Sequence, residues 1–285
     1  METLEIHRPE TLAQALEIKA EHPAATPLAG GTDLMVAINF RHTRPDAVLD
    51  LTAVPELGEW GPDDGRVRVG AGVTYTRLIE ELGDRLPGLA IASRTVGSPQ
   101  IRNRGTVGGN LATASPAGDG LPPLYTSGAV VELASVRGTR RVPVAEFVTG
   151  PKRTCIEPDE LIAAFELPAA SGPQQFAKVG TRNAMVIAVC SVALAIWPEQ
   201  RRVAACVGSA GPTPLVATEA EEYIARALDW DGGAPIDDDA LARFGELVGA
   251  CARPIDDVRG TARYRSHAVA VLGRRTLMWA WSAYR

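Results

Sequence analysis

The sequence contains few of the residues that build disulfide frameworks, metal centres or nucleic-acid-binding surfaces. Only four of the 285 residues are cysteine and four are histidine, aromatic residues make up 5%, and the net charge is −5. No two cysteines stand in a C-x-x-C spacing and the histidines share no ligand spacing. We therefore expect no disulfide scaffold and no metal or iron–sulfur site on this chain. The acidic balance also argues against a nucleic-acid partner.

Long apolar runs are missing as well. The longest, AMVIAVCSVALAIW at 184–197, is shorter than the roughly 20 residues that a membrane helix needs, so we interpret it as a buried strand or core segment. The first residues, METLEIHRPETLAQALEIKA, show no basic stretch followed by an apolar core, so no secretory signal is expected. We predict a cytoplasmic protein without a transmembrane segment.

What remains is a globular composition, 46% hydrophobic, with strands and helices in mixed order. Thr11 and Gln14 fit a capping box at the start of a helix. Turn and periodicity signals predict further helices over 74–83, 88–97, 218–228 and 237–252 and from about residue 264. They also predict strands over 47–52, 66–70 and 160–168, a hairpin turning at 137–138, and two long strands within 184–211. This order favours an α+β fold over a doubly wound α/β sheet. The Pro/Gly/Ser-rich stretch at 168–175 is the best domain boundary.

The first of three glycine-rich loops is LAGGTD, Leu28 to Asp33. Two glycines after a short strand permit tight backbone dihedrals and a close approach by a ligand. A helix opening near Asp33 would direct free N–H groups at the same point. The alternative is an ordinary strand-to-helix turn.

The second loop, VGAGVTY at 69–75, begins like a dinucleotide fingerprint because Gly70 and Gly72 have the G-x-G spacing. Tyr75 occupies the third glycine position, where a helix must pack closely on a strand. We interpret this loop as a structural turn and expect no Rossmann domain.

The third loop is NRGTVGGNLATASPAGD, 103–119. It is neither G-x-G-x-x-G nor a P-loop, because no GK[ST] follows. Its glycines and hydroxyl residues offer backbone donors with little bulk, although a glycine-rich surface loop would look the same. Two donor-rich loops in one half of the chain suit the two charged groups of a diphosphate. The residues alone thus predict a diphosphate-containing cofactor without separating FAD from other nucleotides.

PLAGGTDLM together with IRNRGTVGGNLATASPAGD resembles the FAD-binding medium subunits of molybdenum hydroxylases, the group of xanthine and carbon monoxide dehydrogenases. The resemblance covers nearly the whole chain, including QQFAKVGTRNAMVIAVCSVALAI. It implies an α+β fold: a two-subdomain FAD-binding domain of the vanillyl-alcohol oxidase (PCMH) type, at 1–57 and 58–170, and a smaller C-terminal α+β domain of the CO dehydrogenase flavoprotein type at 171–285.

The resemblance also implies the residues that bind FAD. They come from both glycine loops and from four isolated positions: Ala29, Gly30, Gly31, Thr32, Asp33, Leu34, Met35, Val96, Thr106, Val107, Gly108, Gly109, Asn110, Asp119, Ile162 and Lys178. Asp119 would otherwise be a turn or cap carboxylate and Lys178 a solvated surface charge. No catalytic residue and no metal ligand is predicted, and FAD is the only redox centre expected here, since the cysteine-rich insertion of some relatives is missing.

As function, the resemblance implies an electron-transfer subunit in a heteromeric oxidoreductase. Partner chains would carry the molybdenum cofactor, on a large subunit, and two-iron clusters, on a small subunit, in a dimer of heterotrimers. Electrons would reach FAD and leave to NAD, oxygen or a quinone. Xanthine or another purine is the first choice of substrate; carbon monoxide, heterocycles such as nicotinate, and aldehydes stay open. A stand-alone flavin oxidase or reductase, and an assembly protein without cofactor, are the alternatives from other classes.

Overall fold

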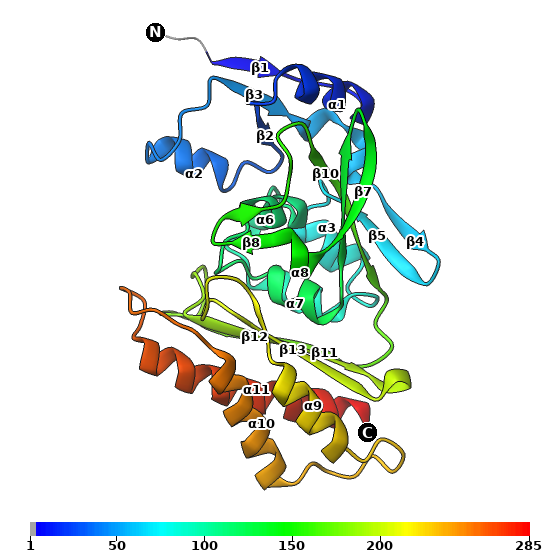
Figure 1. The fold of residues 1–285 in the computed structure, drawn as a ribbon, viewed down its shortest axis with the longest axis vertical. Helices are drawn as coiled ribbons and strands as arrows, with labels where there is room; N and C mark the ends of the chain where they lie inside the picture. Colours follow the sequence, from blue (N-terminus) through cyan, green and yellow to red (C-terminus); the bar gives the residue numbers. More distant parts are fainter. Residues whose placement is uncertain (1–3) are drawn as a thin grey trace.

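Residues 4–285, which the computed structural model describes, form three sheet-based units stacked along the long axis of the molecule (Figure 1). The N-terminal unit holds a parallel three-stranded sheet in the order β1-β3-β2. Its elements are β1 (Glu5–His7), α1 (Leu12–Glu21), β2 (Thr26–Leu28), α2 (Leu34–Asn39), β3 (Ala47–Asp50), η1 (Leu51–Ala53) and η2 (Pro55–Gly58). Helix α2 projects to one side of this sheet (Figure 1) and none of its residues is buried.

The central unit is built on an antiparallel five-stranded sheet, β4-β5-β10-β6-β7. Its elements are β4 (Trp60–Asp63), β5 (Arg66–Gly70), α3 (Tyr75–Glu81), α4 (Pro87–Arg94), α5 (Pro99–Arg102), α6 (Val107–Thr113), α7 (Leu121–Thr126), β6 (Val130–Ser135), β7 (Gly138–Pro143), α8 (Val144–Phe147), β8 (Val148–Gly150), β9 (Arg153–Thr154) and β10 (Leu161–Pro168).

The C-terminal unit packs helices on the antiparallel sheet β11-β12-β13-β14, as Figure 1 shows. Its elements are β11 (Gln174–Val179), β12 (Cys190–Trp197), η3 (Pro198–Gln200), β13 (Arg202–Gly208), β14 (Leu215–Val216), α9 (Thr218–Ala227), α10 (Asp238–Cys251) and α11 (Ala262–Tyr284). Sheets with helices gathered beside them confirm the predicted α+β class. Within residues 4–285, no helix is both long and apolar enough to span a bilayer.

Side-chain caps explain where several helices begin. Thr74, Thr106 and Thr261 each accept a hydrogen bond from the backbone N–H three residues on, which satisfies a donor that the helix itself cannot. Thr11 caps α1 in the same way, as predicted. The reciprocal bond of the predicted capping box is displaced, because the Gln14 side chain accepts from the N–H of Glu10.

One long apolar segment differs from its prediction. The first strand within 184–211 begins only at Cys190, and the preceding residues form a loop. The carbonyl oxygens of that loop are bound by side chains instead of a neighbouring strand: Lys178 donates to Val186, and Ser209 to Ala188. Because these carbonyl oxygens already have hydrogen-bond donors, the segment does not need to pair with a neighbouring strand.

The junction between the central and C-terminal units is buried and hydrogen-bonded. Ala92 of α4 packs against Phe176 and Ala193 of the C-terminal sheet. The Gln174 side chain accepts from the N–H of Gly88 at 3.0 Å, and the Trp197 indole donates to Thr126 O at 3.2 Å. Polar groups buried there thus have partners, which makes this junction specific as well as apolar.

Strand β10 belongs to two hydrophobic cores. Leu161, at 2% exposure, lies in the core of the N-terminal unit with Ala15, Leu49 and Leu57. Its neighbour Ile162 lies in the core of the central unit, because successive strand residues face opposite ways. The start of β10 therefore joins the two units.

Truncating Leu161 to alanine is expected to lower the free energy of unfolding by about 2–5 kcal/mol, since it removes buried methyl groups from a packed core. Urea denaturation of the full chain measures the change. Val136→Ala, at a residue 54% exposed, is the control and is expected to be nearly neutral. Equal stability of the two variants would show that β10 does not hold the N-terminal unit in place.

Candidate functional site

The first and third glycine loops touch each other although about seventy residues separate them in the chain. A Cβ built on Gly30 would lie 2.0 Å from the carbonyl oxygen of Arg104 and 2.9 Å from the Cα of Gly105. Only glycine can occupy position 30 with these backbones in place. The two loops, one from the N-terminal unit and one from the central unit, thus form a single backbone-lined surface.

The rest of the first loop turns the chain into helix α2. Gly31 has φ +75, a left-handed conformation suited to glycine, and Asp33 is the N-cap residue of α2. The Asp33 carboxylate accepts a hydrogen bond from Thr113 Oγ1 at 3.1 Å, so the far end of α6 is tied to this turn. Of the other predicted residues in this loop, three are half-buried and one is exposed: Ala29, Thr32, Leu34 and Met35.

The third predicted loop, 103–119, is a loop only in part: residues Val107–Thr113 form α6, whose N-cap Thr106 is buried. The Thr106 hydroxyl accepts from the N–H of Gly109 at 2.9 Å. This leaves the N–H groups of Val107 and Gly108, which the helix cannot satisfy by itself, for another acceptor. A Cβ on Gly108 would lie 2.4 Å from Ala71 O and 2.6 Å from Ala71 Cα, so α6 rests directly on the end of β5.

A buried polar cluster lies where the central unit meets the C-terminal sheet. Lys178 Nζ is 2.6 Å from Asp119 Oδ2, and the two side chains are 10% and 8% exposed. Thr95 donates to the same Asp119 oxygen at 3.1 Å and its carbonyl accepts from Lys178 at 2.9 Å. The lysine also donates to Val186 O at 3.2 Å. Lys178 therefore binds α4, the loop after α6 and the 184–189 loop together.

Burial governs the titration of this cluster. Desolvation raises the pKa of the Asp119 carboxyl above its usual range, and the Lys178 charge and the hydrogen bonds from Lys178 and Thr95 offset that rise only in part. Burial also raises the pKa of the Tyr75 phenol, and the nearby Asp119 and Asp33 charges add to the effect. The tyrosine therefore stays neutral at physiological pH.

Asn110 connects the glycine loops to this cluster. Its side-chain amide packs against Gly118 and Gly120. A Cβ added to Gly118 would lie 2.8 Å from Asn110 Nδ2, and one added to Gly120 would lie 2.9 Å from Asn110 Oδ1. Its Oδ1 is buried without a partner, and so is Oδ1 of Asp119. Buried acceptors normally have donors, so these two oxygens are suited to the hydroxyl or N–H groups of a bound molecule.

The remaining two predicted residues border the same region. Ile162 is 7% exposed and lies next to a β-bulge in the β10–β6 pairing; bulges often redirect side chains near functional sites. Val96 directly follows Thr95 and packs partly against the central core. Hydrogen bonds and close backbone contacts thus bring together residues from the first loop, the start of α6 and the Asp119–Lys178 pair.

Sequence reasoning missed three residues of this region. Thr95 bonds to both members of the ion pair, since its hydroxyl donates to Asp119 and its carbonyl accepts from Lys178. Thr113 donates to Asp33, and Tyr75 donates its backbone N–H to Gly105 O at 3.0 Å. Only Thr113, a hydroxyl residue within the glycine-rich stretch 103–119, offered a signal. The second loop is a structural turn, as predicted: Cβ atoms on Gly70 and Gly72 would lie 2.3 Å and 3.0 Å from Leu57 O. The sheet that contains β5 is antiparallel, unlike a Rossmann sheet.

The site fits a dinucleotide with a diphosphate bridge. The two glycine loops meet backbone to backbone. The N–H groups of Val107 and Gly108, at the start of α6, have no acceptor within the helix, which suits the charged oxygens of a phosphate. The buried Oδ1 atoms of Asn110 and Asp119 have no hydrogen-bond donor in the part of the chain that the structure describes, so a ligand can supply one. Among residues 4–285, no three His, Cys, Asp or Glu side chains are placed to hold a metal ion together.

Comparison with known proteins agrees with this geometry. Residues 2–170 match the family described as the FAD binding domain in molybdopterin dehydrogenase, and residues 175–280 match the CO dehydrogenase flavoprotein C-terminal domain. The xanthine dehydrogenase FAD-binding subunit of Escherichia coli O157:H7 is 31% identical, over 95% of this chain and 94% of its own. The nicotinate dehydrogenase FAD-subunit of Eubacterium barkeri is 34% identical, over 80% and 81%.

Among solved structures, carbon monoxide dehydrogenase from Hydrogenophaga pseudoflava has a chain that superposes with a TM-score of 0.89 at 27% identity, over 99% of this chain and 98% of that one. The match runs through both the FAD-binding and the C-terminal domain. The chain belongs to the FAD-binding medium subunits of the molybdenum hydroxylase family, the flavin-carrying subunits of xanthine dehydrogenase-type oxidoreductases.

Proposed function

We propose that this chain is the electron-transfer subunit of a xanthine dehydrogenase, and that it holds FAD against the surface that its two glycine loops form together. The observation that supports this most directly is the contact between the two loops. The Gly30 backbone lies so close to the Arg104 carbonyl that a side chain at position 30 would not fit. We assign the loops, with Val96, Asp119, Ile162 and Lys178, to FAD binding, and the division into 1–57, 58–170 and 171–285 to two FAD-binding subdomains and a C-terminal domain.

In this proposal the residues of the chain bind and orient the cofactor. The N–H groups at Gly30–Asp33 and at Val107–Gly108 hold the diphosphate, and Asn110 and Asp119 accept hydrogen bonds from hydroxyl or N–H groups of FAD. Ile162 packs against its apolar part. Lys178 keeps the Asp119 carboxylate ionised and in place at 2.6 Å. When bound, FAD supplies the redox chemistry, accepting single electrons and releasing them in pairs.

The partners follow from the family. We propose a large subunit with the molybdenum cofactor and a small subunit with two-iron clusters, in a dimer of heterotrimers, with NAD, oxygen or a quinone as the final acceptor. Purine is the substrate that we favour, supported by the 31% identity to a xanthine dehydrogenase subunit. A heterocycle such as nicotinate is the second candidate, supported by 34% identity over a shorter length.

The purified chain is expected to carry FAD at about one per chain, because the loops form one continuous site. An absorption spectrum, followed by denaturation and chromatography of the released cofactor, measures this. A colourless chain that takes up no added FAD would refute the site. To test the substrate, the complex is isolated with its partner subunits and mixed anaerobically with xanthine or nicotinate. Bleaching of the flavin band by xanthine alone supports the first candidate, and bleaching by nicotinate alone supports the second.

A further inference from the structure

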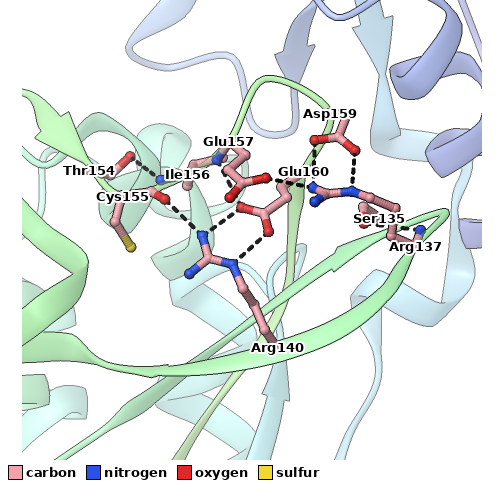
Figure 2. A network of polar contacts seen from close by, with 9 residues as sticks. All are labelled: Ser135, Arg137, Arg140, Thr154, Cys155, Ile156, Glu157, Asp159 and Glu160. Carbon is pink, nitrogen blue, oxygen red and sulfur yellow. Dashed lines mark hydrogen bonds and ion pairs between the residues drawn. The ribbon is translucent and has the colours of Figure 1, made fainter.

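A polar network outside the FAD-binding residues holds the segment that leads into β10. Figure 2 shows Arg137 and Arg140, from the β6–β7 hairpin, reaching toward acidic residues of the 155–160 loop. Arg140 binds both carboxylate oxygens of Glu160, at 2.6 Å and 2.8 Å, and also donates to Cys155 O at 2.8 Å. Such a bidentate contact, called a fork below, fixes the orientation of the two side chains as well as the distance between them.

The same loop is closed from the inside. Oε2 of Glu160 accepts the N–H of Glu157 at 2.8 Å, while Arg137 binds Glu157 at 2.7 Å and Asp159 at 2.8 Å. The Glu160 side chain is 4% exposed, whereas Arg140 is 41% exposed. The fork from Arg140 lowers the pKa of the Glu160 carboxyl, so this buried group is ionised at neutral pH.

Glu160 directly precedes the two residues that join the upper units. Leu161 enters the core of the N-terminal unit, which carries the first glycine loop, and Ile162 enters the central core. A shift of this segment would therefore move the N-terminal unit, with Gly30, relative to the central unit, with Gly108. Interiors packed at crystal-like density transmit such shifts.

A second connection runs from the same segment to the third loop. The β-bulge lies between Ile162 and Ala164, and the carbonyl of Ala163 accepts the N–H of Ala71 at 3.0 Å. Ala71 is the residue on which Gly108 rests, 2.6 Å from its added Cβ. The start of β10, the end of β5 and the beginning of α6 are thus one packed unit.

From this geometry we propose that Arg140 and Glu160 are positioning residues of the flavin site: their fork sets the start of β10, and with it the alignment of the two glycine loops and of Ile162. Neither residue is among those assigned to FAD contact. The inference rests on the proposed placement of FAD on the surface that the two loops form.

The test compares Arg140→Gln and Glu160→Gln with Arg68→Gln in the full chain. Arg68 makes a matched fork to Glu132 at 2.7 Å and 3.0 Å across the same sheet, away from the 155–160 loop. Three quantities are measured: the Kd for FAD, the visible circular dichroism of bound flavin, and the melting temperature without FAD. The last separates general destabilisation from loss of alignment.

We expect Arg140→Gln and Glu160→Gln to raise the Kd for FAD about tenfold or more, the size of loss seen when an outer partner of a metal ligand is removed, and to change the dichroism of the bound flavin. Arg68→Gln is expected to lower the melting temperature similarly with both flavin readouts unchanged. Arg140→Lys keeps the charge without the fork and replaces Arg140→Gln in the comparison if that variant does not fold.

Two results separate failure of this inference from failure of the proposed function. Wild-type affinity and dichroism in both Arg140 and Glu160 variants, with FAD bound normally by the wild type, would overturn the positioning role alone. An equal flavin defect in Arg68→Gln would overturn it too, since the effect would then be general loss of sheet stability. A wild-type chain that binds no FAD would instead overturn the placement of the cofactor.

Discussion

Replacing Gly108 with valine is expected to give a folded chain that binds no FAD. The new Cβ would lie 2.4 Å from Ala71 O and 2.6 Å from Ala71 Cα. Both are backbone atoms, which cannot move away by a side-chain rotation. Helix α6 must therefore move away from β5, and the N–H groups of its first turn move with it. Overpacking usually costs about 1–3 kcal/mol, less than the 5–15 kcal/mol that holds most domains folded.

The measurement is the FAD content of the purified variant, followed by titration with added FAD and by far-ultraviolet circular dichroism. Gly61→Val is the matched control, because a Cβ at Gly61 would meet nothing within 4 Å and valine suits a strand. The control is expected to keep its cofactor. Stoichiometric FAD in Gly108→Val would show that the start of α6 does not form the site.

The sequence predicted the glycine loops because their chemistry is local. A Gly-Gly pair after a strand specifies backbone conformation within a few residues, and Gly31 indeed adopts a left-handed turn conformation. The helix α6 that Thr106 caps was not predicted, because two adjacent glycines disfavour a helix. What the residues alone could not predict was that Arg104 lies against Gly30. Contacts between distant segments depend on how whole units pack, which local patterns do not encode.

The polar cluster shows the same limit. The resemblance placed Asp119 and Lys178 in the cofactor site, but nothing in the spacing of 119 and 178 indicates an ion pair, and Thr95 gives no signal at all. The apolar run from Ala184 predicted a strand six residues too early, because the side chains that satisfy its carbonyls come from Lys178 and Ser209. Apolar character predicts burial more reliably than it predicts a sheet ladder.

Replacing Lys178 with methionine is expected to destabilise the chain by about 3–5 kcal/mol at neutral pH, because it leaves a buried carboxylate without its counter-charge. Asp119 is 8% exposed and one of its oxygens is already unpartnered. Urea unfolding of the chain without FAD measures the loss. Lys152→Met, at an exposed lysine, is the control and is expected to be nearly neutral. Wild-type stability of Lys178→Met would mean that the ion pair contributes nothing to the junction.

The loss should also depend on pH in a defined direction. Burial holds the folded pKa of Asp119 above the ordinary 3.8, and removing Lys178 raises it further, so the folded state binds a proton that the unfolded state has released. Relative to the wild type, the loss is therefore absent below the wild-type folded pKa of Asp119, grows as pH rises from that value to the higher folded pKa in Lys178→Met, and is complete above the latter. Adding Asp119→Asn to Lys178→Met removes the charge, and should restore most of the stability at neutral pH and abolish the pH dependence of the loss. A double variant no more stable than Lys178→Met would show that packing of the lysine stem, rather than the uncompensated carboxylate, accounts for the effect.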